Sequence, residues 1–280
     1  MLILTALTSQ GGFGRQIYRN FAGSLDATGF KGDVVFLTTL REIAASKLST
    51  LQDEIDCLKF SPIPGPGDNR DINCYRYRHY YDYLRSRSGD YDYVMLSDSR
   101  DVIFQRDISK YPFHPETDLF LAEEEKLIGE CGINSGWIFD LYGENWRQAL
   151  KNKTVLCSGT TIGRPPAMLQ YLEIMLEHIE RVDEEFHERF GYLGGIDQGI
   201  HNYLYHANKL TGLSVKTMHN QDNLFYTIGH VAHDDRDRVF LDEQSKFINQ
   251  DGKLCYCIHQ FDRLDEHIRR AFNQNSPFSV

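Results

Sequence analysis

The chain has 280 residues, of which 41% are hydrophobic and 25% are charged, and its formal net charge is −10. A chain of this length and composition folds as a globular protein with one large domain or two small ones. The acidic excess argues against nonspecific binding to nucleic acid or to an anionic membrane surface, because both favour a basic protein. An anionic small substrate stays compatible with it where a metal ion or arginines supply the positive charge.

The first 105 residues alternate strand-like and helix-like segments. Continuous apolar runs predict strands at 2–8, 33–39 and 92–96, and apolar residues at helical spacing predict helices at 14–28, 41–53 and 71–87. The tyrosines of the third helix have the spacing of one packed helix face, which favours core packing over sugar stacking. Residues 60–70, rich in proline and glycine, are expected to form a loop. Such alternation is typical of a parallel sheet with crossover helices.

The second half of the chain is less regular. We predict strands at 118–122, 136–141, 154–163 and 254–263, and helices at 166–189, 194–206 and after 263. No internal repeat or flexible linker divides the chain, so we expect a single α/β domain over residues 1–280.

Membrane and export signals are not evident in the sequence. No apolar run reaches the ~20 residues that a membrane span requires. The apolar start at residues 1–12 is too short for a signal peptide and has no basic beginning. We therefore expect a soluble cytoplasmic protein. Its cysteines form no Cys-X-X-Cys pair, which favours buried reduced thiols over a zinc site. They are Cys57, Cys74, Cys131, Cys157, Cys255 and Cys257.

Charged residues follow the predicted strand at 92–96. They are Asp98, Arg100 and Asp101. In an open α/β sheet, ligands bind outside the carboxyl ends of the strands, so these side chains should face that crevice. Two carboxylates this close attract a hard divalent cation, which can in turn bind phosphate oxygens. The structural alternative is a capped turn in which Arg100 neutralises one aspartate.

Three later segments carry further candidates. Ser158 and Gly159 follow buried-strand residues, where small side chains let a ligand approach the backbone. Asp197 and Gln198 stand behind two glycines at the expected start of a helix, where Asp197 is also a candidate N-cap. His259 ends the late strand, although a single histidine at a strand end is more often structural.

The succession "LSDSRDVIFQ", "LCSGTTIG", "GGIDQGIHNYL" and "IHQFDR" resembles nucleotide-sugar-dependent glycosyltransferases of the GT-A fold. It is similar to the small soluble enzymes with which bacteria and large algal viruses build surface glycans. The resemblance covers about residues 1–265 and rests on the order and spacing of these segments. It implies a Rossmann-like α/β fold with a mixed, mainly parallel sheet flanked by helices. We expect a nucleotide-binding half at 1–105 and an acceptor-binding half at 106–280.

The resemblance also implies a divalent metal ion, Mn²⁺ or Mg²⁺, that bridges the two phosphates of the donor. Asp98 and Asp101 correspond to the acidic motif that holds it, and His259 to a further ligand. The two acids are three positions apart, with Arg100 between them, which departs from the family's spacing. Which of them binds the metal directly therefore stays open, and Asp98 is also a candidate for a donor contact.

Residues around the donor sugar follow from the same resemblance. Ser158 and Gly159 match the small residues that line the sugar. Asp197 matches the acid beside the acceptor. It is the candidate base if the reaction inverts the sugar carbon, because a carboxylate must then take the acceptor's proton. If the reaction retains the configuration, Asp197 or Gln198 would orient the sugar instead.

Candidates for contacts to the nucleotide lie elsewhere. The first strand and its loop, including Thr8, could hold the base and ribose. Arg15, Arg76 and Arg263 are candidates for diphosphate contacts, with surface or paired arginines as the alternative.

We thus expect a metal-dependent glycosyltransferase that moves a sugar from a UDP-sugar, such as UDP-xylose or a UDP-hexose, to a glycan hydroxyl. Its partners would be a nucleotide-sugar donor and an oligosaccharide or glycan acceptor. Two alternatives stay open. One is a sugar-phosphate nucleotidyltransferase, for which residues 8–15 are a partial match without the usual lysine. The other is a non-catalytic glycan-binding module.

Overall fold

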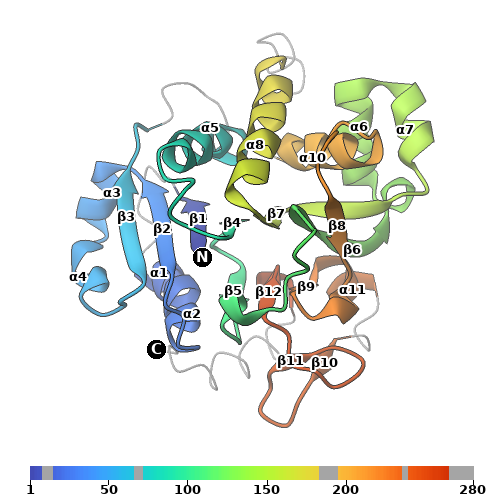
Figure 1. Ribbon diagram of the computed structural model, residues 1–280. Coiled ribbons are helices and arrows are strands. Elements are labelled where there is room, and N and C mark those ends of the chain that lie inside the picture. Colours follow the sequence, from blue (N-terminus) through green and yellow to red (C-terminus); the bar gives the residue numbers. More distant parts are fainter. Residues whose placement is uncertain (8–14, 66–71, 183–194, 235–238, 265–280) are drawn as a thin grey trace.

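The computed structural model describes residues 1–7, 15–65, 72–182, 195–234 and 239–264, and a seven-stranded sheet forms the centre of this part (Figure 1). The strand order is β3-β2-β1-β4-β7-β6-β8. Strands β1 to β4 run parallel to one another, β7 runs antiparallel to both β4 and β6, and β8 runs parallel to β6. The predicted mixed, mainly parallel α/β sheet is confirmed. Its strands are β1 (Leu2–Ala6), β2 (Asp33–Thr38), β3 (Leu58–Pro62), β4 (Val94–Ser97), β6 (Leu119–Leu127), β7 (Thr154–Gly163) and β8 (Val215–Met218).

Helices flank the sheet (Figure 1). Three of them, α5 (Ile72–Arg85), α8 (Pro165–Glu180) and α10 (Ile196–His206), pack on one face. Tyr77 and Tyr80 of α5 are buried in that core, which confirms that this tyrosine-rich helix packs against the sheet. The other helices are α1 (Arg15–Tyr18), continued by a π-helical turn (Arg19–Gly23) and α2 (Ser24–Asp26), then α3 (Leu40–Ala45), α4 (Ser49–Gln52), α6 (Gly132–Tyr142), α7 (Glu144–Leu150) and α11 (Gly229–Asp234).

The two faces of the sheet belong to two hydrophobic cores, because successive residues of a strand point to opposite faces. In β1, Leu2 and Leu4 belong to the core under α5, α8 and α10, whereas Ile3 belongs to the core on the opposite face. All three side chains are completely buried. Burial on both faces explains why this strand is a continuous apolar run rather than an alternating one.

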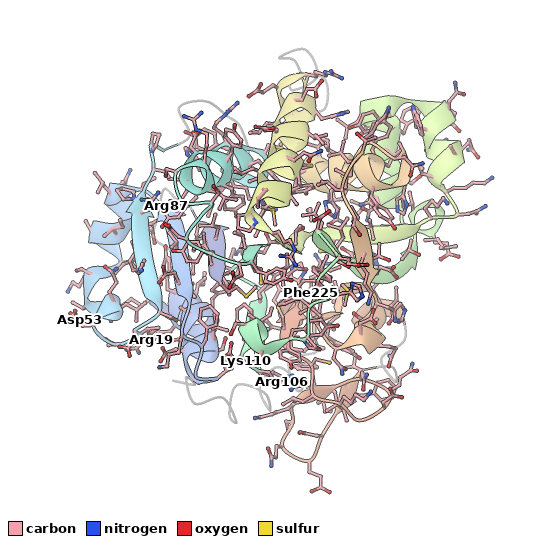
Figure 2. The ribbon with its side chains drawn as sticks, in the orientation of Figure 1. Arg19, Asp53, Arg87, Arg106, Lys110 and Phe225 are labelled. Atoms are coloured by element: carbon pink, nitrogen blue, oxygen red, sulfur yellow. The ribbon has the colours of Figure 1, made fainter. Side chains whose placement is uncertain are left out.

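A smaller sheet contributes to the second core. Its order is β5 (Val102–Phe104), β12 (Cys257–His259) and β9 (Phe225–Thr227), with β12 antiparallel to β5 and parallel to β9. Phe225 is buried, whereas Arg106 and Lys110 near the same sheet are exposed (Figure 2). A two-stranded ribbon joins β10 (Phe240–Leu241) to β11 (Phe247–Ile248). The small sheet matters for function because β5 directly follows the acidic segment after β4.

Two sequence predictions about secondary structure are wrong. Residues 136–141, predicted as a strand, lie in helix α6. A six-residue apolar run does not distinguish a strand from a helix, and here Asn134 and Ile138, one helical turn apart, are buried while Ile133 and Phe139 are exposed. Residues 63–65 of the predicted loop at 60–70 are in no helix or strand and residues 66–70 lie outside the described residues, but residues 60–62 form the end of β3. Pro62 is tolerated there because β3 is an edge strand and Pro62 is its last residue.

Other boundaries differ less. The predicted helix at 41–53 is divided into α3 and α4, and the late strand is only three residues long before a 3₁₀ turn at Phe261–Arg263. Helix α8 ends at Glu180, before the predicted end at residue 189, and residues 183–189 lie outside the described residues, as does the whole predicted helix after residue 264. All six cysteines are buried and none forms a disulfide, as predicted. Among the described residues, no helix has both the length and the apolar character needed to cross a membrane.

Candidate functional site

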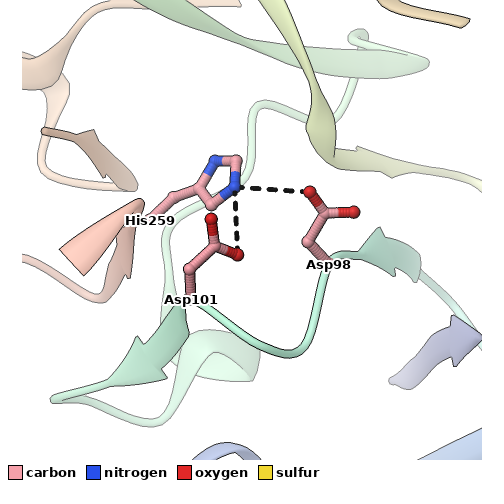
Figure 3. A group of neighbouring side chains, drawn as sticks. All are labelled: Asp98, Asp101 and His259. Atoms are coloured by element: carbon pink, nitrogen blue, oxygen red, sulfur yellow. Dashed lines mark ion pairs between the residues drawn. The ribbon is translucent and has the colours of Figure 1, made fainter. Parts of the chain in front are cut away.

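Three potential metal ligands converge at the carboxyl end of β4 (Figure 3). A short turn after β4 carries Asp98 and Asp101 and leads into β5, which pairs with β12 so that Val102 lies opposite His259. The Nε2 atom of His259 lies 3.5 Å from Oδ2 of Asp98 and 3.7 Å from Oδ1 of Asp101. One ligand atom from each residue falls within 4.8 Å of the others. Strand pairing thus joins segments that are far apart in the sequence.

Backbone hydrogen bonds fix the two aspartates. The amide of Asp98 donates to the carbonyl of Gly159 at 2.8 Å, and the hydroxyl of Ser97 donates to the carbonyl of Asp98 at 2.7 Å. The amide of Gln260 donates to the carbonyl of Asp101 at 2.8 Å, which Gln260 reaches in a left-handed conformation with φ +64°. Both carboxylates are therefore held in place by the strands on either side of them.

Ser158 and Gly159 lie within β7, whose bounds match the strand predicted at 154–163. The pairing of β7 with β6 shifts register between Thr161 and Cys157, so residues 158–160 form a bulge beside β4. A Cβ atom on Gly159 would lie 2.5 Å from Cε1 of His259 and 2.6 Å from Oδ2 of Asp98. Glycine is needed there because any side chain would occupy the space between two of the three potential ligands.

The donor set fits a divalent cation. Two carboxylate oxygens and one imidazole nitrogen suit Mn²⁺ better than Mg²⁺, which prefers oxygen ligands alone. The other ring nitrogen of His259, Nδ1, lies 3.3 Å from Sγ of Cys157, and this contact turns Nε2 toward the carboxylates. The side chains of Asp98 and Asp101 are 32% and 17% exposed, so a ligand can reach them, whereas His259 is buried at 2%.

A buried arginine links the candidate metal site to α10. The guanidinium of Arg76 contacts Oδ1 of Asp98 and, through Nη2 at 2.9 Å, Oδ2 of Asp197. Burial raises the pKa of Asp98, but Arg76 and His259 outweigh it and hold this pKa below the usual range. Burial raises the pKa of Asp101, and the nearby charge of Asp98 raises it further. The two aspartates thus differ in electrostatic environment although they are close in sequence.

Asp197 is enclosed at the first turn of α10. Its Oδ2 accepts hydrogen bonds from Arg76, from the hydroxyl of Ser158 at 3.0 Å and from the hydroxyl of Tyr77 at 3.4 Å. Burial raises the pKa of Asp197, although Arg76 opposes the shift. The N-cap is Gly195, with φ +86°, so the N-cap role considered for Asp197 is wrong. Its carboxylate instead binds side chains from α5 and β7.

The remaining predicted residues are dispersed. Arg15 pairs with Glu54 at 2.7 Å on the N-terminal helix. Arg263 is exposed in the 3₁₀ turn after β12, and its charge acts on Asp101. Arg100 is exposed on the turn between β4 and β5. Thr8 lies outside the described residues.

The sequence analysis missed a second polar cluster next to the candidate metal site. It contains Glu124 from β6 and His230 from α11, whose Oε2 and Nε2 atoms are 2.9 Å apart. Glu124 is only 2% exposed at the side chain. A signal was present in the sequence, because Glu124 continues the inward alternation of Phe120 and Ala122 along β6. A carboxylate at an inward position requires a partner.

Comparison with solved structures supports the fold. The chain is similar to the crystal structure of mouse xyloside xylosyltransferase 1 in its apo form, with a TM-score of 0.53 and 11% sequence identity. The match covers 92% of this chain and 96% of that one. No family model and no curated protein matches the sequence. The structural likeness, at this low identity, confirms the predicted GT-A-like glycosyltransferase fold.

Proposed function

We propose that this protein is a metal-dependent glycosyltransferase that moves a sugar from a UDP-sugar to a hydroxyl of a glycan. The observation that carries the proposal is the convergence of Asp98, Asp101 and His259 at the carboxyl end of β4 in a GT-A-like fold. Ligand sites of open α/β sheets lie at that edge. The name of the structural neighbour supports UDP-xylose as the first donor to test, with UDP-hexoses next.

The charges of the site support departure of a nucleotide diphosphate. A divalent cation held by the three ligands would neutralise the charge that develops on the leaving diphosphate. The chain's own part is to hold the two carboxylates in a fixed position. Arg76 does so for Asp98, and backbone bonds from Gly159 and Gln260 restrain the turn. Because these groups are already ordered, little reorganisation is needed when the donor binds.

Asp197 has two candidate roles in this proposal. In an inverting reaction it would take the proton of the acceptor hydroxyl. In a retaining reaction it would orient the sugar. The enclosed position of its carboxylate, 3% exposed and bound by Arg76 and Ser158, supports the second role.

Contacts to the rest of the nucleotide remain predictions. We propose that residues 1–105 bind the nucleotide and residues 106–280 the acceptor. Thr8 is proposed for the base and ribose, and Arg15, Arg76 and Arg263 for the diphosphate. Arg76 contacts Asp98 and the charge of Arg263 acts on Asp101, so these two arginines are close to the proposed metal.

The proposal is tested by thermal unfolding with UDP, GDP or CMP and their sugar conjugates, each with and without Mn²⁺. A ligand at 100 times its dissociation constant stabilises the folded state by roughly 2.7 kcal/mol. We expect a Mn²⁺-dependent increase in melting temperature with UDP compounds. Asp101→Ala should abolish it, whereas Asp53→Ala, an exposed aspartate at the end of α4 beside the edge strand β3, should leave it unchanged.

The outcomes separate the alternatives. No stabilisation by any nucleotide would overturn the proposal and favour a binding module. An unchanged response in Asp101→Ala would overturn the assignment of the metal ligands. Formation of pyrophosphate from UTP and a sugar phosphate would identify a nucleotidyltransferase.

A further inference from the structure

Five side chains next to the candidate metal site form a closed hydrogen-bonded ring, here called the Gln198 ring. Nε2 of Gln198 donates to Oε1 of Glu124 at 3.2 Å and to Oδ1 of Asn134 at 3.0 Å. Nε2 of His230 contacts Oε2 of Glu124 at 2.9 Å, and His230 also bonds Cys131. Nδ2 of Asn134 closes the ring by donating to Sγ of Cys131 at 3.2 Å. The ring joins α10, β6, α11 and the start of α6 (Figure 1).

Two acidic groups of the ring, Glu124 and Cys131, determine which of its atoms donate hydrogen bonds and which accept them. Burial raises the pKa of Glu124, but His230 outweighs it and holds this pKa below the usual value, so Glu124 is a carboxylate that only accepts. The sulfur of Cys131 accepts a hydrogen bond from Nδ2 of Asn134 at 3.2 Å, and hydrogen bonds from His230 and Asn134 lower the pKa of this thiol to about 7. Asn134 therefore presents its amide nitrogen to Cys131 and its carbonyl oxygen to Gln198. Both neighbours of the Gln198 amide nitrogen are acceptors.

This polarity leaves Gln198 a single orientation. A carboxamide nitrogen has two hydrogens, and Glu124 and Asn134 take one each. If the carboxamide flipped, its carbonyl oxygen would face two acceptors, which is unfavourable. Oε1 is thus the atom that remains, and it accepts no hydrogen bond from any of the described residues. Glu124, which Gln198 contacts, also accepts at 3.5 Å from Nε2 of Gln260, the residue after His259, so Oε1 of Gln198 belongs to the surroundings of the candidate metal site.

We propose that Glu124, Asn134, Cys131 and His230 are positioning residues that fix Oε1 of Gln198 as an acceptor for a hydroxyl of the donor sugar. This inference rests on the proposed function, because it assigns a sugar contact within that site. The ring does not include Asp98, Asp101 or His259, so its effect should be confined to the sugar and leave the nucleotide unaffected. That separation makes the inference testable by itself.

The test exchanges the hydrogen-bond donor at position 198 with the hydrogen-bond acceptor at position 124. Glu124→Gln lets the Gln198 carboxamide flip, because a glutamine at 124 can offer either an oxygen or an amide. Gln198→Glu places two carboxylates in contact. In the double variant the amide nitrogen at 124 can donate to the carboxylate at 198, while the carboxamide oxygen at 124 still accepts from His230, so this contact again pairs a donor with an acceptor. Its Glu at 198 still has an oxygen free for the sugar.

Affinity is measured by titration calorimetry with Mn²⁺-UDP and Mn²⁺-UDP-xylose, and with Mn²⁺-UDP-glucose if the xylose donor does not bind. Each single variant should lose roughly 3- to 10-fold in affinity for the UDP-sugar, as for one lost hydrogen bond, and none for UDP. The double variant should recover most of the loss. Glu144→Gln and Gln148→Glu are matched controls, because Gln148 donates to Glu144 at 2.8 Å on the exposed surface of α7.

The outcomes distinguish this inference from the proposed function. If UDP binds but the sugar adds no affinity in the wild type, or the single variants bind the UDP-sugar normally, the inference is overturned. Folded single variants that lose affinity without recovery in the double variant would also contradict the polarity of the ring. If UDP does not bind at all, the proposed function fails. The sugar contact is then overturned as well. The ring itself is tested separately, by comparing hydrogen exchange of the Gln198 side-chain amide in the wild type and in Glu124→Ala.

Discussion

The first turn of α10 carries two adjacent side chains that are held by opposite means. Asp197 is held by the cation of Arg76, which also contacts Asp98. Gln198 is held by the acceptors Glu124 and Asn134. A buried charge needs an opposite charge, whereas an amide needs partners of the right polarity. Substitutions in the first network should therefore change stability, and those in the Gln198 ring should change ligand affinity and titration.

The largest effect on stability is expected for Arg76→Leu. It leaves Asp197 without its cation and Asp98 with His259 alone, and loss of one partner of a buried ion pair costs about 3–5 kcal/mol of unfolding free energy. Urea unfolding followed by tryptophan fluorescence measures this. Arg78→Leu is the control on the same helix, since the Arg78–Glu180 pair is exposed and should contribute at most about 1 kcal/mol. Equal losses in both variants would show that Arg76 is not the centre of a charge network.

Gly159→Ala should come next. Its Cβ would lie 2.6 Å from Oδ2 of Asp98, so the turn must shift, at a cost of about 1–3 kcal/mol, and Mn²⁺-dependent binding of UDP should be lost. Gly136→Ala serves as the control, because a Cβ there meets nothing within 4 Å. It lies inside α6 and should stabilise the protein by about 0.5–1 kcal/mol. Retained Mn²⁺-dependent binding in Gly159→Ala would contradict the tight packing assigned to this glycine.

A smaller loss is expected for Ser158→Ala. It removes one hydrogen bond to Asp197, while Arg76 continues to neutralise that carboxylate. The unfolding free energy should fall by about 0.5–1.5 kcal/mol, the usual net contribution of one hydrogen bond. Urea unfolding gives the value, and a loss as large as that of Arg76→Leu would mean that the serine, not the cation, supports Asp197.

The Gln198 ring should titrate without changing stability. Burial raises the pKa of the Cys131 thiol, but hydrogen bonds from His230 and Asn134 lower it to about 7. The hydrogen bond that His230 donates to Cys131, together with the one to Glu124, raises the pKa of His230 to about 9. In the unfolded chain the pKa is 9.0 for the thiol and 6.5 for the imidazole. As the pH rises from 7 to 9, the lowered thiol pKa therefore makes the folded state more stable, while the raised imidazole pKa makes it less stable. Between pH 7 and 9 the folded state and the unfolded state each hold one proton on this pair of groups, so the two effects on stability cancel.

Thiolate absorbance makes this titration visible. The difference between wild type and Cys131→Ser should have a midpoint near pH 7, and His230→Gln should move that midpoint upward. Cys57, Cys157 and Cys255 do not interfere, because burial raises their pKa values to about 12, about 11 and about 12. A midpoint in the ordinary thiol range would show that Cys131 is not a thiolate acceptor in the ring.

The candidate metal site was predictable because it follows from the topology of the sheet. Apolar residues 94–96 identify β4, and carboxylates just after a parallel strand face the ligand edge. His259 followed from the order of the segments. The helical state of residues 136–141 and the bulge at 158–160 were not predictable, because both depend on packing against other elements rather than on local pattern.

The Gln198 ring was beyond prediction for a different reason. Glu124, Cys131, Gln198 and His230 come from separate elements, and each alone has an ordinary structural explanation. Their function depends on which atom donates and which accepts, and only the three-dimensional arrangement determines that. Cys131 illustrates the point, since it is buried and forms no disulfide, as predicted, yet hydrogen bonds from His230 and Asn134 lower the pKa of its thiol to about 7.

The pairing of β5 with β12 also determines when the site forms during folding. The side chain of Gln105, just after β5, donates to the carbonyl of Cys255, which is 150 residues further along the chain. Contacts between such distant segments close a long loop and form slowly. On the ribosome, β1 to β4 can be made and can collapse well before residues 257–259 emerge. Asp98 and Asp101 are therefore synthesised long before His259. A nascent chain cannot bring the three potential metal ligands together until most of the protein has been synthesised.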